Sequence, residues 1–289
     1  MQTNIAVLLQ YALPKQAISA LAGKLANLQA GQFTTAVIGW FVKRYNVNMA
    51  EAAEPNISTY KTFNDFFTRP LKTDARPLAN ATFICPVDGA ISQLGDIKND
   101  QIFQAKGHAY STTALVGGDK GLAKKFENGH FACLYLSPKD YHRIHMPCDG
   151  TLKTMTYVPG ALFSVNPTTA QGVPGLFARN ERVVCEFESA EHGCFIMVLV
   201  GATIVGSMAT SWHDSVNGIV NPPRTSNIRV WSYQNQNINL KQGDEMGKFL
   251  LGSTVVMLFE NDTLRFNEVW QAERAIKLGD VMATKFNSI

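Results

Sequence analysis

Charged residues are scarce in this chain. Asp, Glu, Lys and Arg make up 17% of its 289 residues, against about 25% in typical soluble domains. The shortfall predicts a surface that is partly covered by a partner subunit or a bilayer, although an ordinary β protein rich in Gly, Thr and Asn would have the same composition. The net charge of +3 is too small to favour a nucleic-acid partner, but it is compatible with anionic lipid headgroups.

Cysteine pairs and long apolar runs are missing as well. No basic start leads into an apolar stretch with a small-residue cleavage site, so we expect no secretory signal. Residues 25–42 are uncharged but too polar for a membrane span, and residues 193–212 are β-branched and broken by glycine, which predicts two buried strands. Five cysteines without a CxxC pair predict reduced thiols in a cytosolic type of compartment: Cys85, Cys133, Cys148, Cys185 and Cys194.

The first part of the chain has helical periodicity. Apolar residues recur every three or four positions in two stretches, which are separated by Gly31 and preceded by Pro14. Such helices either pack on a core or lie on a membrane surface, and the spacing alone leaves both open. A third, shorter helix is expected between Thr62 as its cap and Pro70 as its stop. The periodic residues are Ile18, Leu21, Leu25, Leu28, Phe33, Val37, Phe41 and Tyr45.

From about residue 80 onward the pattern changes to short apolar runs separated by Gly, Pro, Asn and Asp. We find no internal repeat and no linker long enough to separate independent domains. The sequence therefore predicts an α+β fold, with a helical region over residues 1–70 and a mostly antiparallel β-rich region over residues 71–289. The expected strands are residues 83–91, 130–136, 150–158, 182–187, 195–205, 228–232 and 249–259.

Three polar clusters lie in this apolar background. Asp88 follows a proline in a turn, His142 and His145 lie three residues apart, and Ser253 stands between a glycine and an apolar run. Asp, His and Ser together can form a nucleophilic triad, in which His takes the serine proton and Asp orients the imidazole. A turn aspartate, hydrogen-bonded core histidines and a strand serine would give the same residues, so the pattern alone does not decide.

Other chemistries use the same residues. His142, His145 and Cys148 are ligand types that suit zinc, but Pro147 and the β setting argue against the helix that would align them. Ser253 could serve an ordinary hydrolase, although the G-x-S-x-G elbow is absent. A carrier fold that presents Lys106 is a third alternative, for which the chain is too long.

Taken together and in order, the motifs resemble those of the bacterial phosphatidylserine decarboxylase proenzymes. The likeness extends over essentially the whole chain, and we find no departure at a motif position. The motifs are Pro86-Val-Asp-Gly89, His142-Arg-Ile-His-Met-Pro147, Tyr157-Val-Pro-Gly160, Leu162-Phe-Ser-Val-Asn166, Leu176-Phe-Ala-Arg-Asn-Glu-Arg182, Val200-Gly-Ala-Thr-Ile-Val-Gly206 and Leu251-Gly-Ser-Thr254.

The resemblance implies that the chain cleaves itself between Gly252 and Ser253 into chains 1–252 and 253–289. The Ser253 hydroxyl would attack the Gly252 carbonyl, which no Cβ crowds, and Ser253 would become a covalently bound pyruvoyl group. Asp88 and His145 would serve as orienter and base, with Thr254 as a hydroxyl contact near the oxyanion. The pyruvoyl carbonyl would then act as the electron sink for decarboxylating phosphatidylserine to phosphatidylethanolamine and CO2, a lyase reaction of phospholipid biosynthesis.

His142 is the candidate that binds the substrate carboxylate or supplies the final proton, and the sequence does not separate it from His145. Tyr157, Leu162 and Phe163 are expected in an apolar substrate pocket, and no metal is expected. The family likeness also implies a heterodimer of the two cleavage products, a dimer of these, and a peripheral place on the cytoplasmic face of the inner cell membrane. Anionic lipid would meet the N-terminal helices near Trp40, Lys43 and Arg44.

Overall fold

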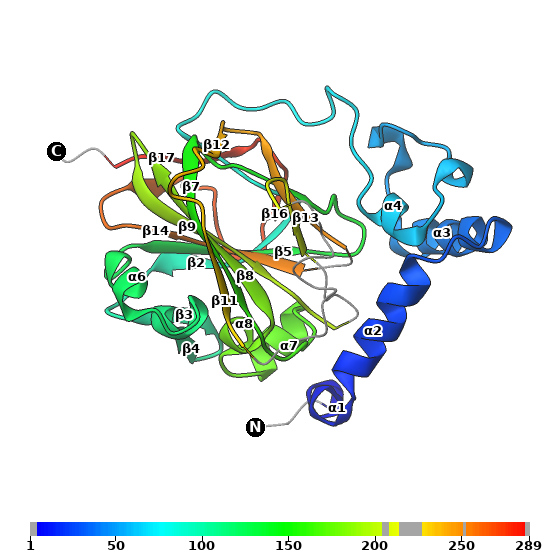
Figure 1. Ribbon diagram of the computed structural model, residues 1–289, viewed down its shortest axis with the longest axis horizontal. Helices are drawn as coiled ribbons and strands as arrows, with labels where there is room; N and C mark the ends of the chain where they lie inside the picture. Colours follow the sequence, from blue (N-terminus) through cyan, green and yellow to red (C-terminus); the bar gives the residue numbers. More distant parts are fainter. Residues whose placement is uncertain (1–4, 204–207, 214–226, 251–252, 287–289) are drawn as a thin grey trace.

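The computed structural model of the protein describes residues 5–203, 208–213, 227–250 and 253–286. Helices α1–α4 extend along one side of a β-rich body (Figure 1). This arrangement confirms the predicted α+β class and its N-terminal helices. None of the helices in the described ranges has the length and apolar character needed to cross a bilayer.

Local sequence signals account for the N-terminal elements. Gly31 precedes α3, and Pro14 precedes α2. The Thr62 side chain accepts the Asp65 N–H while the Asp65 carboxylate accepts the Thr62 N–H, so α4 begins at a capping box, as the predicted Thr62 cap requires. The elements are α1 Ile5–Ala12, α2 Lys15–Ala26, α3 Gln32–Tyr45, η1 Met49–Glu51, η2 Ile57–Thr59 and α4 Phe63–Phe67.

The β body is built around one large antiparallel sheet with the strand order β11-β7-β8-β9-β14-β5-β2-β16, to which β12 adds by pairing with β7. Two smaller sheets, β1-β17-β15 and β10-β13-β6, and the β3-β4 hairpin complete it. The strands are β1 Phe83–Ile84, β2 Gly89–Asp96, β3 Gln101–Ala105, β4 His108–Ser111, β5 His130–Leu136, β6 Arg143–His145, β7 Gly150–Val158, β8 Arg182–Ser189, β9 Gly193–Val200, β10 Met208–Thr210, β11 Arg229–Ser232, β12 Asn239–Leu240, β13 Glu245–Phe249, β14 Ser253–Phe259, β15 Leu264–Phe266, β16 Ala275–Ile276 and β17 Val281–Lys285.

Two strands predicted as continuous are each divided between sheets. The 83–91 run forms β1 and β2, and the 249–259 run supplies the end of β13 and all of β14. The first division is explained at Gly89, where a Cβ would lie 2.2 Å from the Tyr135 carbonyl oxygen of β5. Only glycine lets β2 start this close to its neighbour. The prediction of two strands over 193–212 is confirmed by β9 and β10.

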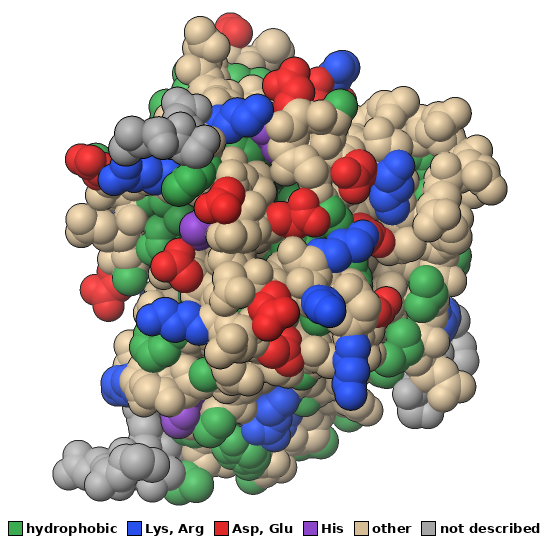
Figure 2. Space-filling view, turned by 90° about the vertical axis from the view of Figure 1, so that its left-hand side faces the viewer, with side chains coloured by type: hydrophobic (Ala, Val, Ile, Leu, Met, Phe, Trp, Pro, Cys, Tyr) green, Lys and Arg blue, Asp and Glu red, His purple; other side chains and the backbone are tan. Residues whose placement is uncertain are grey.

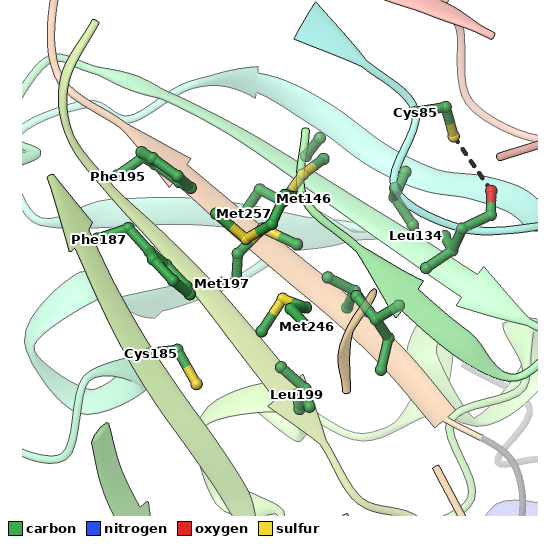
Figure 3. Packing of buried hydrophobic residues seen from close by; sticks show 14 of the residues in the cluster. Cys85, Leu134, Met146, Cys185, Phe187, Phe195, Met197, Leu199, Met246 and Met257 are labelled. Atoms are coloured by element: carbon green, nitrogen blue, oxygen red, sulfur yellow. Dashed lines mark hydrogen bonds between the residues drawn. The ribbon is translucent and has the colours of Figure 1, made fainter. Parts of the chain in front are cut away.

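The core lies on both faces of the large sheet. Strand β14 sends Val256 and Leu258 into one apolar cluster, together with residues of the small helices α5 Thr112–Leu115, α6 Lys120–Lys125 and α8 Leu176–Arg179. Val255 and Met257 enter the second cluster, shown in Figure 3, which the two smaller sheets cover. Burial on both faces explains the unbroken apolar run of β14. The remaining helix is α7 Pro167–Gly172.

All five cysteines are unpaired, as predicted, and all five are buried. Their setting is apolar: Cys85 and Cys185 lie in the second cluster, where the Cys85 thiol donates to the Val87 carbonyl at 3.2 Å (Figure 3). Burial raises the pKa of the Cys194 thiol to about 12, so it is not an activated nucleophile at neutral pH.

Candidate active site

A tight loop between β5 and β6 holds His142. The Asp140 carboxylate accepts both the N–H and the O–H of Ser137 at 2.7 Å, which fixes the turn. The Asp140 carbonyl in turn lies 2.8 Å from His142 Nδ1. Because a carbonyl only accepts, Nδ1 carries the proton and Nε2 is left with a lone pair.

The His142 imidazole is fully buried, and its ring centroid lies 4.1 Å from that of Phe67 in α4. Burial lowers its pKa to about 3, so the ring is neutral at physiological pH. Its Nε2 atom is buried and has no hydrogen-bond partner among the described residues. An unsatisfied basic nitrogen of this kind is a feature of functional sites rather than of well-packed cores.

His145, in β6, has the same tautomer but a different neighbourhood. Its Nδ1 donates to the Gly243 carbonyl at 2.8 Å, and its Nε2 accepts from the Tyr141 hydroxyl at 3.1 Å. Burial lowers its pKa as well. The basic nitrogen of His145 is therefore occupied, whereas that of His142 is not.

Asp88 is held by an arginine. Arg76 Nε contacts both carboxylate oxygens, at 2.9 and 3.1 Å, Arg76 Nη2 binds the second oxygen, and the Leu278 N–H donates to the first at 2.9 Å. Arg76 also binds Glu51 at 2.7 Å. These two acids raise the pKa of the Arg76 guanidinium, which stays charged and pins the Asp88 carboxylate in place.

The structure brings the predicted triad residues to neighbouring segments. The His145 N–H donates at 2.9 Å to the carbonyl of Pro86, two residues before Asp88. The Asp88 carboxylate and the His145 imidazole are not hydrogen-bonded to each other, because each has the other partners given above. The Ser253 backbone opens β14 opposite Leu136, the residue before the Ser137 turn. Its side chain and Gly252 lie outside the described part of the chain, so the triad stays a prediction.

Thr254, the next residue of β14, is completely buried. Its hydroxyl oxygen has no partner within the described ranges. A buried hydroxyl without a partner normally costs about 1–3 kcal/mol. The role of Thr254 as a contact of the oxyanion stays a prediction.

A polar cavity of about 760 Å³ is lined by Asp88, Asp140 and Tyr141, but His142, His145 and Thr254 are not on its wall. Its size falls in the range of small-molecule sites. Tyr135 and Ser137 on its wall flank Leu136, which pairs with Ser253. Further wall residues are Glu51, Arg69 and Arg76.

Comparison with known proteins shows the family to which the chain belongs. A model of the family described as phosphatidylserine decarboxylase matches residues 63–284, and a second one, described as PSD, matches residues 5–46. The chain belongs to the phosphatidylserine decarboxylase family. It is similar to the phosphatidylserine decarboxylase proenzyme of Dechloromonas aromatica (strain RCB), with 68% identity over 99% of this chain and 100% of that protein. The proenzyme of Albidiferax ferrireducens is 67% identical over 97% of both chains, and that of Herminiimonas arsenicoxydans is 65% identical over 98% of this chain and 95% of its own.

The predicted pocket residues of this family member lie elsewhere in the body. The buried Tyr157 hydroxyl donates to Glu181 at 3.0 Å. Leu162 is buried, and the Phe163 ring meets Tyr11 of α1 at 5.1 Å between centroids. Their role in substrate binding stays a prediction.

The sequence analysis missed Arg76, Tyr141 and Arg69. Tyr141 directly precedes the quoted histidine segment, but only the fold shows that its hydroxyl reaches His145. Arg76 and Asp88 are separated by a turn and a strand, and a lone arginine in a polar stretch carries no signal of its own. In the described residues, no three His, Cys, Asp or Glu side chains are grouped to hold a metal ion.

Proposed function

We propose that this chain decarboxylates phosphatidylserine to phosphatidylethanolamine and CO2, using a pyruvoyl group made from Ser253 by self-cleavage after Gly252. One observation carries the proposal beyond family membership. The Ser253 backbone pairs with Leu136, which lies between Tyr135 and Ser137 of the cavity wall, and Thr254 Oγ1 and His142 Nε2 are both buried without a partner in the described part of the chain. Unsatisfied polar atoms at this place fit a reacting carbonyl.

Asp88, His145 and Tyr141 suit the self-cleavage step. His145 Nε2 is the nitrogen that can accept the Ser253 proton, and the Tyr141 hydroxyl that donates to it must move aside or relay that proton. Asp88 acts as a fixed negative charge that favours the imidazolium, because Arg76 prevents its carboxylate from turning. Thr254 Oγ1, which is buried without a partner in the described chain, would donate to the developing oxyanion.

The pyruvoyl group, once formed from Ser253, would supply an electrophilic carbonyl that serves as the electron sink of the decarboxylation. His142 handles protons around it. In the empty site the pKa of about 3 makes Nε2 a weak base, so the proton that it gives to the carbon after CO2 has left must be taken up with the substrate bound. Until it leaves as CO2, the substrate carboxylate would raise the pKa of His142 and so favour the charged ring.

Substitution of each histidine should impair a different step of the reaction. His145→Gln should leave one uncleaved chain, whereas His142→Gln should still give chains 1–252 and 253–289 but release CO2 at least about 100-fold more slowly, the usual scale of a lost acid–base group. Gel electrophoresis and intact mass report the first step, and CO2 release from phosphatidylserine vesicles reports the second. A decarboxylating protein that remains continuous across 252–253, with no borohydride-reducible carbonyl, would refute the proposal. Labelling of an intact Ser253 by a serine-reactive phosphonate would favour the hydrolase alternative.

We also propose that the N-terminal helices lie on the membrane, which fits a substrate held in a bilayer. Leu25, Phe33 and Trp40 are 60%, 68% and 60% exposed and border an apolar groove of about 580 Å³ between α2, α3 and α4. Lys43 and Arg44 end α3 beside them, where they would meet anionic headgroups. The side of the body away from these helices has charges of both signs interspersed (Figure 2). A peripheral place on the cytoplasmic face and a dimer of the cleaved heterodimer complete the proposal.

Vesicle sedimentation tests the membrane face. Changing Leu25, Phe33 and Trp40 together to Glu should weaken binding to anionic vesicles more than tenfold, since burying each apolar side chain is worth roughly 1.5–3 kcal/mol. The matched control changes Val230 and Val269, exposed apolar residues of the β body, to Glu and should bind as before. Equal binding by all three proteins would show that the helices do not dock.

A further inference from the structure

Arg69 is a buried cation that has no counter-ion among the described residues. It follows α4, and only 3% of its surface is exposed. Its guanidinium donates to the carbonyls of Phe66 and Lys139, both at 3.4 Å, and Nε is buried with no partner in the described chain. It is not paired with any carboxylate of the described residues. Burying such a group uncompensated is costly.

Two other buried arginines show how this chain normally satisfies a guanidinium. Arg76 is paired with Asp88 and Glu51. Arg182 has no acidic partner in the described residues, but Nε donates to the Leu115 carbonyl at 2.6 Å and the other nitrogens donate to Asn180, at 2.8 Å, and Ala114. Arg69 has neither solution, since it makes two long bonds for five N–H donors.

The position of Arg69 on the cavity wall indicates that its missing partner is an anionic ligand. Its side chain lines the polar cavity beside Asp140 and Tyr141. Phe67, two residues earlier, stacks on the His142 ring, and the charge of Arg69 contributes to lowering the pKa of His142. Lys139 adds a second, exposed cation on the same wall. The wall also carries acids, but Glu51 and Asp88 are paired with Arg76, and Asp140 is hydrogen-bonded to Ser137. Arg69 and Lys139 form no ion pair with a carboxylate among the described residues.

We propose that Arg69 binds the phosphodiester of the substrate headgroup. This assignment rests on the proposed function, because the phosphodiester belongs to the substrate of that reaction. A guanidinium fork matches phosphate oxygens, and a charge-assisted bond to an anion would satisfy donors that the protein leaves unused.

The chemistry of the reaction favours the phosphate over the carboxylate as the bound anion. The carboxylate loses its charge as CO2 leaves, so an arginine holding it would stabilise the ground state more than the transition state. The phosphate keeps its charge throughout. Arg69 should therefore lower KM and leave kcat nearly unchanged, which is the signature of uniform binding.

The test compares two soluble probes by calorimetry on the mature two-chain protein. Glycerophosphoethanolamine carries the phosphate without a carboxylate, and O-methylserine carries the carboxylate without a phosphate. Arg69→Gln should weaken glycerophosphoethanolamine binding at least about tenfold, with O-methylserine unaffected, and Arg69→Lys should restore part of the loss. In vesicle assays of Arg69→Gln, KM for phosphatidylserine should rise about tenfold and kcat should change less than about threefold.

The controls keep the outcomes distinct. Lys125→Gln removes an exposed charge paired with Glu186 and should bind both probes normally. Melting temperature and the two-chain gel pattern show whether each variant folds.

Three results would contradict the phosphate assignment. Loss of O-methylserine binding alone would assign Arg69 to the carboxylate, and equal loss of binding of both probes would make its role structural. A wild-type protein that does not bind glycerophosphoethanolamine would exclude the site. If phosphatidylserine itself releases no CO2, the proposed function fails, but the calorimetric difference would still decide the anion site.

Discussion

Replacing His142 with Gln should make the folded protein less sensitive to acid. The imidazole is fully buried and neutral in the native state, where its pKa is about 3, against 6.5 for an exposed histidine. Between these two values the unfolded chain binds a proton that the folded chain does not. The folded-state pKa is depressed, so the contribution of this residue is fully present above pH 6.5 and is lost as the pH falls towards 3.

The magnitude follows from the shift. Each pKa unit corresponds to 1.36 kcal/mol, so a shift from 6.5 to about 3 limits the contribution to roughly 5 kcal/mol. Between pH 8 and pH 5 only the first 1.5 units below the unfolded pKa are crossed, which corresponds to about 2 kcal/mol of lost unfolding free energy. Other groups titrate in the same interval, so the informative quantity is the difference between wild-type and variant.

Urea unfolding at pH 8 and pH 5 measures this difference. Both proteins should carry Ser253→Ala, which keeps each a single chain and preserves the linkage between folding and titration. The acid-induced loss of unfolding free energy should be about 2 kcal/mol smaller in His142→Gln. Parallel losses in the two proteins would mean that the ring is not held neutral by burial, and the proton-transfer role proposed for Nε2 would lose its basis.

Substitutions at three further positions test the packing and ion pairing described above, again by urea unfolding of Ser253→Ala proteins. Arg76→Met leaves the buried Asp88 carboxylate without its cation and should cost about 3–5 kcal/mol, while Arg76→Lys should cost less; equal stability of Arg76→Met and the parent would refute the ion pair. Gly160→Ala puts a Cβ 2.5 Å from the Arg179 carbonyl oxygen and should cost about 1–3 kcal/mol. Gly23→Ala in α2, where a Cβ meets nothing within 4 Å, should instead stabilise by roughly 1 kcal/mol, and a loss there would count against the helix.

The elements that could be predicted from the sequence are those fixed by short-range rules. The Thr62 cap is read from four consecutive residues, and the buried strand over 255–259 is read from its own apolar run. The division of the 249–259 run was not predictable in this way. Phe249 and Val255 enter the same apolar cluster although β13 and β14 belong to different sheets, so hydrophobicity continues across a change of sheet.

The parts of the site that escaped prediction depend on contacts between distant segments. Asp88 reads as a turn acid in the sequence, but its partners are Arg76 and the Leu278 N–H, which is 190 residues away. The tautomer of His145 is fixed by a carbonyl 98 residues away. Such partners are chosen by the packing of sheets and loops, and a single sequence contains no local signal for them.

The two histidines illustrate what the geometry adds to the residue pattern. The sequence presents them as equivalent, three residues apart, and their rings share one tautomer because each Nδ1 donates to a backbone carbonyl. They differ in burial, which is complete only for His142, and at Nε2, which in His145 accepts from Tyr141 and in His142 has no partner among the described residues. His145 already accepts a hydrogen bond from the Tyr141 hydroxyl. Such a base suits the single proton transfer of self-cleavage, in which the Ser253 hydroxyl would take the place of the Tyr141 hydroxyl. A buried base with an empty lone pair suits a proton that is taken from one substrate atom and returned to another, because nothing else competes for it. We therefore assign self-cleavage to His145 and decarboxylation to His142 because their Nε2 atoms differ in availability, although the residue type is the same.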